Sequence, residues 1–229
     1  MRPFHLLCPP LNAEEQLELC NRLRFRCEHG HNGISHRNCF DRSERIDERI
    51  GFFDIETSDL SANIGIMLSY CIKPEGSDEI LHGVVTQKEL MTPEEDKRVV
   101  KQCAADLKKF DRVVVFWGKD RRHDLPFIRT RAIEHKVMFP LYREVWVTDC
   151  WDWAKTKLRL NSNRQVTVAK QILGETEKTQ IDWRVWRRAG RGNKECLAEV
   201  LDHNMRDVRD LERIYHTLLP YVRNHNASI

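Results

Sequence analysis

Short runs of mostly apolar residues alternate with stretches of helical spacing along most of this 229-residue chain. Three of these runs come before the first long helical pattern of the main part of the chain. A turn signal at 73–77 separates the second run from the third, and this arrangement predicts a three-stranded antiparallel unit. Two later runs, with helical patterns around them, complete an α/β fold whose mixed central sheet is flanked by helices. The predicted strands are residues 50–57, 64–72, 80–86, 112–117 and 145–148.

Apolar residues that recur every three or four positions predict the helices. One is predicted to begin at Thr92, because Thr92-Pro93-Glu94-Glu95 combines an N-cap residue, a proline suited to the first helical position and a capping box. Further helices are predicted around 125–133 and over 166–173, where Gly174 is expected to end the helix. The last helix presents a single stripe at steps of three and four, formed by Val200, His203, Asp207, Leu211, Ile214 and Leu218.

Residues 1–45 differ in composition from the rest of the chain, and we expect them to form a small appendage to a domain at 49–222. A helix is predicted over 12–26, followed by a segment rich in cysteine and histidine. Four of its five ligand side chains could complete a tetrahedral structural zinc site, although solvated loop histidines explain the same pattern. Cys8 and Cys20 are outside candidates. The five side chains are Cys27, His29, His31, His36 and Cys39.

The overall composition is that of a soluble globular protein, with 32% Asp, Glu, Lys and Arg and a formal net charge of +3. A net charge this small does not by itself identify a nucleic-acid partner. No apolar run has the length of a membrane span and the N-terminus lacks the features of a signal peptide, so we expect a cytoplasmic protein with no membrane partner. The eight cysteines are then expected to be free thiols or metal ligands.

Two carboxylates lie within the apolar run at 50–57. Because side chains alternate along a strand, Asp54 and Glu56 point to the same side. Burying them unpaired would be costly, so either a divalent cation or basic side chains must meet them. His203 and Asp207 interrupt the apolar stripe of the last helix one turn apart, and the simplest account is that all these groups share one site.

A basic segment at 183–194 interleaves two tryptophans with positive charges. Arginines beside aromatic rings suit contacts with phosphates and bases, although an exposed basic helix with inward-packed tryptophans gives the same pattern. The candidate arginines are Arg184, Arg187, Arg188 and Arg191, and Lys178 is a further candidate contact. Asp149, at a strand end, is expected to be structural or auxiliary. The acids expected to be solvated are Asp59, Asp120 and Asp210.

Three short motifs follow one another in the main part: Asp54-Ile55-Glu56 on the first strand, His123-Asp124-Leu125-Pro126-Phe127 at a helix start, and His203-Asn204-Met205-Arg206-Asp207 on the last helix. In order, spacing and context they resemble the motifs of the DEDD superfamily of 3′–5′ exonucleases, which have a ribonuclease H-like fold. The likeness covers about residues 49–222. It is greatest to small stand-alone bacterial and phage proteins related to the proofreading domain of family B DNA polymerases.

The resemblance implies a metal-dependent 3′–5′ exonuclease that acts on DNA or RNA with a free 3′ end and releases nucleoside 5′-monophosphates. It implies that two Mg²⁺ or Mn²⁺ ions are held by Asp54, Glu56, Asp124 and Asp207, with Asp54 bridging both. It further implies that His203 orients or deprotonates the attacking water. Arg129, on the turn after the second motif, joins the candidate substrate contacts.

Two features depart from the family pattern. Gly118 and His123 stand where the family often has an asparagine and an aromatic residue before the second acid, so substrate positioning is expected to differ there. His203 occupies the spacing at which one branch has a tyrosine, which leaves weakened catalysis open. The alternative functions are a catalytically quiet nucleic-acid-binding module and a structure-specific endonuclease of the same fold.

Overall fold

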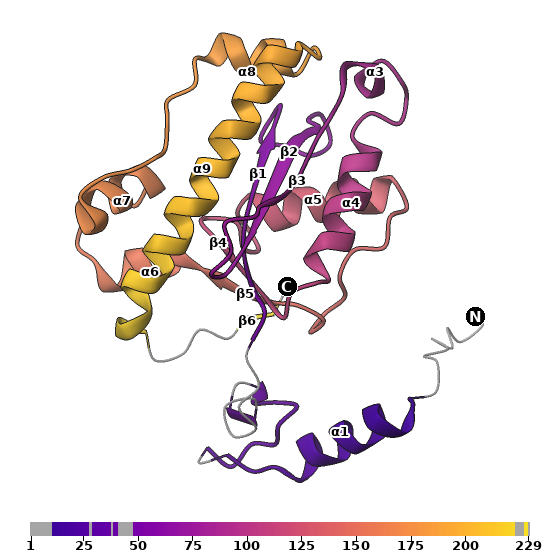
Figure 1. Ribbon diagram of the computed structural model, residues 1–229, viewed down its shortest axis with the longest axis vertical. Coiled ribbons are helices and arrows are strands. Elements are labelled where there is room, and N and C mark those ends of the chain that lie inside the picture. Colours follow the sequence, from indigo (N-terminus) through magenta and orange to yellow (C-terminus); the bar gives the residue numbers. More distant parts are fainter. Residues whose placement is uncertain (1–10, 28, 38, 41–47, 223–226, 229) are drawn as a thin grey trace. The chain divides into compact units, whose positions relative to one another are not determined.

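The computed structural model describes residues 11–222 except 28, 38 and 41–47, together with 227–228 (Figure 1). The chain divides between Glu48 and Arg49 into two compact units. Each unit is described by itself below. Among the described residues, no helix combines the length and the apolar character needed to cross a membrane.

A mixed sheet with strand order β3-β2-β1-β4-β5-β6 forms the centre of the larger unit. Its central strand, β1, pairs antiparallel with β2 on one side and parallel with β4 on the other. The antiparallel β1-β2-β3 unit and the mixed sheet are both confirmed. The strands are β1 (Ile50–Thr57), β2 (Met67–Pro74), β3 (Leu81–Val84), β4 (Arg112–Val115), β5 (Trp146–Asp149) and the two-residue β6 (Ala227–Ser228).

Helices cover both faces of this sheet, which is why its central strands are apolar on both sides (Figure 1). Phe53 and Ile55 of β1 belong to the core that also holds residues of α4 (Lys97–Leu107) and α5 (Asp124–Glu134). Phe52 points the other way, into a second core. That core includes residues of α6 (Cys150–Lys157), α7 (Gln165–Leu173) and α9 (Lys194–Leu218).

Because Asp54 and Glu56 follow Phe52 at steps of two, they lie on the face that α9 covers. The six predicted stripe positions of α9 are all buried, which confirms the prediction for this helix. Gly174 ends α7 in the left-handed conformation, at φ 79°, as expected. The remaining helices of this unit are α3 (Gln87–Leu90), α8 (Trp183–Ala189) and the 3-10 turn η1 (Leu219–Tyr221).

The predicted start of the helix at Thr92 is wrong, because α4 begins at Lys97 and its N-cap residue is Asp96. Asp96 is fully buried, and its carboxylate accepts the backbone N–H of Met67 and bonds from Arg131 and His135. This tertiary network determines the chain path before the helix, in preference to the local capping signal. The short helix α3 was not predicted, although its capping box of Thr86 and Glu89 is visible in the sequence.

The smaller unit contains helix α1 (Ala13–Arg24), whose N-terminus has a capping box formed by Asn12 and Glu15. None of the residues of α1 is buried. In the described part of this unit, Phe40 is the one buried apolar side chain, and it packs edge-on against Phe25 with ring centroids 5.4 Å apart. The unit therefore has very little apolar core.

Candidate active site

All five side chains predicted to form the site line a single pocket of about 320 Å³. They come from three elements that are far apart in sequence: the central strand β1, the first turn of α5 and the middle of α9. Other side chains on the wall of the pocket are His123, Lys178 and Trp186. The five are Asp54, Glu56, Asp124, His203 and Asp207.

His203 and Asp207 project from consecutive turns of α9 toward the acids of β1. Nε2 of His203 lies 3.7 Å from Oε1 of Glu56 and 3.7 Å from Oδ2 of Asp207. The other ring nitrogen, Nδ1, lies 3.0 Å from the Thr179 hydroxyl, which fixes the orientation of the ring. Ligand atoms of Glu56, His203 and Asp207 all lie within 4.8 Å of one another, close enough to share one cation.

Asp124 is held at the N-terminus of α5 by the loop that follows β4. The backbone N–H of Leu125 donates to the Gly118 carbonyl at 2.9 Å. A β-carbon at Gly118 would lie 2.2 Å from Oδ2 of Asp124, so the carboxylate occupies space that only glycine leaves free. The glycine at position 118, where the family often has an asparagine, therefore makes room for the carboxylate of Asp124.

The loop itself is anchored by Asp149, at the end of β5. Its carboxylate accepts backbone N–H bonds from Trp117, Gly118 and Lys119 at 2.9–3.1 Å, and it pairs with Arg122. Asp149 also caps α6, a helix that the sequence analysis did not predict. Because groups of the protein itself already bind both oxygens of this carboxylate, Asp149 acts by positioning the loop.

Lys178 lies inside the acid cluster. Its Nζ pairs directly with Asp207, and its charge also acts on Asp54 and Glu56. Burial alone would lower the pKa of Lys178, but the charges of Asp207 and Asp54 outweigh that effect and the net shift is upward. The lysine is therefore a fixed positive charge within the pocket.

The acids repel one another in spite of this cation. Burial, and then the charge of Asp207, raise the pKa of Asp54 to about 8. Burial and the neighbouring carboxylates also raise the pKa of Glu56 and of Asp124. Burial lowers the pKa of His203, and the charge of Asp207 only partly offsets that shift. One lysine thus leaves the pocket short of positive charge.

The pocket fits divalent cations by its chemistry. Oδ2 of Asp124 and Oδ1 of Asp207 are buried and, among the described residues, accept no hydrogen bond. Buried carboxylate oxygens without partners are costly unless something positive reaches them. Four carboxylates form a set of hard oxygen ligands of the kind that Mg²⁺ and Mn²⁺ prefer.

A groove of about 750 Å³ extends from Asp54 past three aromatic side chains, of which Trp117 is exposed, to the segment before α7 and the start of that helix. Trp117 is 46% exposed, and its backbone has a positive φ of 65° at the tip of the loop that Asp149 anchors. Sequence reasoning did not single out this groove, because its walls combine loop residues with the first residues of α6 and α7, which only the folded chain brings together. The residues concerned are Phe116, Trp117, Trp151, Ser162, Asn163, Arg164, Gln165 and Val166.

The candidate substrate contacts lie in different environments. Arg184, Arg187 and Arg188 are exposed on α8, and Arg191 is exposed just after it. Arg129 pairs with Asp120 at 2.9 Å on the surface of α5. α8 also contributes Trp186 to the wall of the acid pocket, so the helix that carries these arginines borders that pocket.

Asp59 and Asp120 are exposed, as expected, but the prediction of a solvated Asp210 is wrong. Asp210 is fully buried and accepts bonds from the Thr176 hydroxyl at 2.5 Å and the Glu177 backbone N–H at 3.0 Å. These bonds fasten the segment that carries Lys178 to α9. The signal that was missed is that Asp210 follows Asp207 by three positions and so shares its buried face.

The order of strands, with an antiparallel meander followed by parallel strands and with acids at the central strand, defines a ribonuclease H-like α/β domain. A family model described as the RNase_H superfamily matches residues 51–219, and the chain belongs to this superfamily. A search of curated proteins gives no match. Membership indicates a nuclease-type activity on nucleic acids, and nucleases of this fold generally use divalent metals.

Proposed function

We propose that the chain is a metal-dependent 3′–5′ exonuclease that hydrolyses phosphodiester bonds of DNA, with RNA as the alternative substrate. The observation that carries this proposal is the convergence of four carboxylates from β1, α5 and α9 on one pocket, with two buried oxygens that lack partners among the described residues. Their order along the chain is that of the DEDD exonuclease motifs, which supports attack at a 3′ end.

The acids would bind two Mg²⁺ or Mn²⁺ ions, which supply the Lewis acidity that activates water and offsets the charge of the scissile phosphate. Asp54, on the central strand, would be the ligand shared by both ions; its charge acts on both Glu56 and Asp124, and the charge of Asp207 acts on it, which supports this role. The remaining ligands are Glu56, Asp124 and Asp207.

His203 would accept the proton of the attacking water. Its Nε2 is directed at the acids, whereas Nδ1 is occupied by the Thr179 hydroxyl. A neutral imidazole in this orientation can act as a general base. Lys178 would contact a phosphate oxygen above the acids, since its charge already lies among them.

The groove beside Asp54 would receive the nucleic acid. Aromatic rings such as those of Trp117 and Trp151 stack on bases of any identity, which suits a single strand. The arginines of α8 would contact phosphates farther from the scissile bond.

The test is cleavage of a 5′-labelled single strand, as DNA and as RNA, with Mg²⁺, with Mn²⁺ and with a chelator. We expect a ladder that shortens from the 3′ end and that disappears when the 3′ end is blocked. Cuts in a circular single strand would instead identify an endonuclease. Tight binding without cleavage in either metal would overturn the enzymatic proposal and identify a binding module.

Removing the positive charges of α8 is expected to weaken substrate binding and its dependence on salt. For Arg184, Arg187 and Arg188 all changed to alanine, the slope of log affinity against log salt should fall by about 2, because each lost phosphate contact on a single strand removes about 0.7. The measurement is a salt titration by fluorescence anisotropy. The matched control removes three exposed positive charges on α3, on α4 and at the C-cap of α4, with Lys88, Lys101 and Lys108 changed to alanine, and should leave the slope unchanged. Equal slopes in the two variants would exclude α8 as a binding surface.

Gly118→Ala is expected to lower the cleavage rate by about a hundredfold, because a displacement of about 1 Å at a catalytic group costs that much. The added β-carbon would meet Asp124 at 2.2 Å and Val115 at 2.8 Å, so the carboxylate must move. The measurement is single-turnover cleavage with metal in excess. Gly190→Ala is the control, since its β-carbon would meet nothing closer than 3.6 Å, and it should retain full activity. Full activity in Gly118→Ala would show that the position of Asp124 is not critical.

A further inference from the structure

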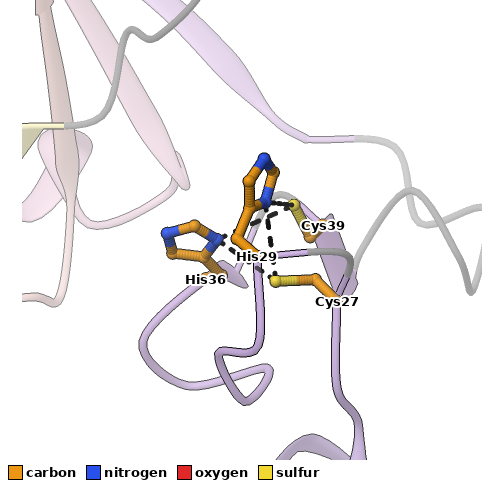
Figure 2. Close-up of side chains that lie close together, drawn as sticks. All are labelled: Cys27, His29, His36 and Cys39. Atoms are coloured by element: carbon orange, nitrogen blue, oxygen red, sulfur yellow. Dashed lines mark hydrogen bonds between the residues drawn. The ribbon is translucent and has the colours of Figure 1, made fainter.

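A second cluster of metal-ligating side chains lies in the smaller unit and plays no part in the proposed nuclease reaction. It consists of two cysteines and two histidines whose ligand atoms all lie within 4.8 Å of one another (Figure 2). The four residues are Cys27, His29, His36 and Cys39. Sulfur and imidazole are softer ligands than the carboxylates of the larger unit, so this cluster favours a different metal.

We propose that this cluster binds one zinc ion, which provides most of the stability of the N-terminal unit. Tetrahedral zinc, with bonds of about 2.3 Å to sulfur and about 2.0–2.1 Å to nitrogen, places each sulfur about 3.6 Å from each nitrogen. Sγ of Cys27 lies 3.6 Å from Nδ1 of His29 and 3.4 Å from Nδ1 of His36. For Cys39 the corresponding separations are 3.8 and 3.9 Å. All four sulfur–nitrogen edges therefore match the tetrahedron.

The backbone sets up both halves of this site. In the first half, the Gly30 N–H donates to the Cys27 carbonyl at 2.8 Å, and the Cys27 N–H donates to the His31 carbonyl at 3.0 Å. Gly30 has a φ of 78°, the left-handed conformation that glycine adopts at little cost, and this turn places Cys27 and His29 side by side.

In the second half, His36 and Cys39 lie one helical turn apart. The N–H groups of Cys39 and Phe40 both donate to the His36 carbonyl, at 3.1 and 3.3 Å. Side chains three positions apart on a helical turn share one face, so both ligands point to the same side. His31 is not part of the ligand group, and its ring lies against that of His36 with centroids 4.0 Å apart.

The unit needs such a ligand because its apolar core is very small. α1 buries none of its residues, and its leucines at 17, 19 and 23 are 63%, 38% and 45% exposed. Phe40 is the one buried apolar side chain in the described part of the unit. Segments this small usually require a metal or disulfides to fold, and zinc binding supplies folding free energy directly.

The test is the zinc content of the full chain purified under reducing conditions, measured by elemental analysis. We expect about one zinc per chain, as a four-ligand site holds. His36→Ala and Cys39→Ser should lose the zinc, whereas the neighbouring changes His31→Ala and Cys20→Ser should retain it. Asp207→Asn, in the acid pocket, should also retain it, which separates this site from the proposed nuclease site.

A second measurement does not depend on the folding of the variants. Cobalt in place of zinc in the unmodified chain should give the visible absorption of a tetrahedral ion and a near-ultraviolet band from thiolate ligands. Adding a chelator should speed proteolysis within residues 11–40 at least about tenfold and leave the thermal unfolding of the larger unit unchanged. Absence of zinc after loading, a disulfide between Cys27 and Cys39, or equal losses in His31→Ala and His36→Ala would overturn the proposal.

Discussion

Asp54→Asn is expected to lower the rate of phosphodiester cleavage by at least about a thousandfold, the scale of losing one charge-stabilising group of a catalytic site. The charge of Asp54 acts on both Glu56 and Asp124, and the charge of Asp207 acts on Asp54. An amide keeps the shape of the side chain but removes the charge that would hold the cations. The measurement is single-turnover cleavage of a 5′-labelled strand at saturating Mg²⁺ or Mn²⁺.

The same substitution is expected to stabilise the metal-free protein. The pKa of Asp54 is raised from 3.8 to about 8, chiefly by burial and then by Asp207. A group whose pKa is higher in the folded state stabilises that state below its unfolded pKa, and the contribution is lost as the pH rises through the folded value. The unmodified protein should therefore lose stability between about pH 4 and pH 8, and Asp54→Asn should lose less.

In urea unfolding, we expect the free energy of unfolding of Asp54→Asn to exceed that of the unmodified protein by about 1–3 kcal/mol at pH 8, and the difference to vanish near pH 4. Each pKa unit corresponds to about 1.4 kcal/mol, and the full value is reduced because Asp54 is only partly buried. Saturating Mg²⁺ should remove the advantage, because bound cations stabilise the ionised acids.

Asp59→Asn is the matched control for both measurements. Asp59 lies just after the same strand but is exposed, and an asparagine can still accept the Ser61 N–H bond that it makes at 2.9 Å. Neither activity nor stability should change. If Asp54→Asn retained more than about a tenth of the activity, the acid pocket would not be the catalytic site.

The sequence predicted well the parts of the fold that periodicity determines. The apolar runs identified the five main strands, and all six positions of the stripe predicted for α9 are buried, because the spacing of apolar residues reports which face is buried. The same reasoning predicts that Asp54, Glu56, His203 and Asp207 lie near one another, and all four line the acid pocket. A buried acid within an apolar pattern is conspicuous because it is costly.

What the sequence did not predict depends on contacts between distant segments. The start of α4 is set by the bonds of Asp96 to Met67 and Arg131, and no local pattern encodes these bonds. The position of Lys178 among the acids depends on an irregular segment that Asp210 fastens to α9. Loops have no periodicity, so their side chains can be placed only from the folded chain.

Arg129 and Arg131, two positions apart on α5 and therefore on different faces of the helix, also differ in a way that no local pattern predicts. Arg131→Leu is expected to destabilise the protein by about 3–5 kcal/mol, because it removes the guanidinium that pairs with the buried carboxylate of Asp96 and leaves it only the bonds from His135 and Met67. Arg131 is 3% exposed and donates to Asp96 at 2.6 Å. Asp96 also accepts the N–H of Met67, so this network joins α5 to the start of β2 and the start of α4. The measurement is urea unfolding at neutral pH.

Arg129→Leu is the matched control, two positions earlier on the same helix. Its guanidinium pairs with exposed Asp120, and surface pairs of this kind contribute about 0–1 kcal/mol. We expect this variant to keep its stability and to bind nucleic acid less tightly, since Arg129 is the candidate substrate contact. Equal destabilisation by the two variants would refute the structural role of Arg131.

A double-mutant cycle distinguishes a lost ion pair from lost packing. If the unpaired charge of Asp96 causes the loss in Arg131→Leu, then adding Asp96→Leu should restore part of the stability, because replacing both members of a buried pair costs less than removing one. If the loss came from packing alone, the two changes would add. A coupling of at least about 1 kcal/mol is expected, since residues of one buried network typically couple by 0.5–3 kcal/mol. Such a coupling would show that Arg131 stabilises the fold, although the sequence places it beside the same motif as Arg129, which we propose as a substrate contact.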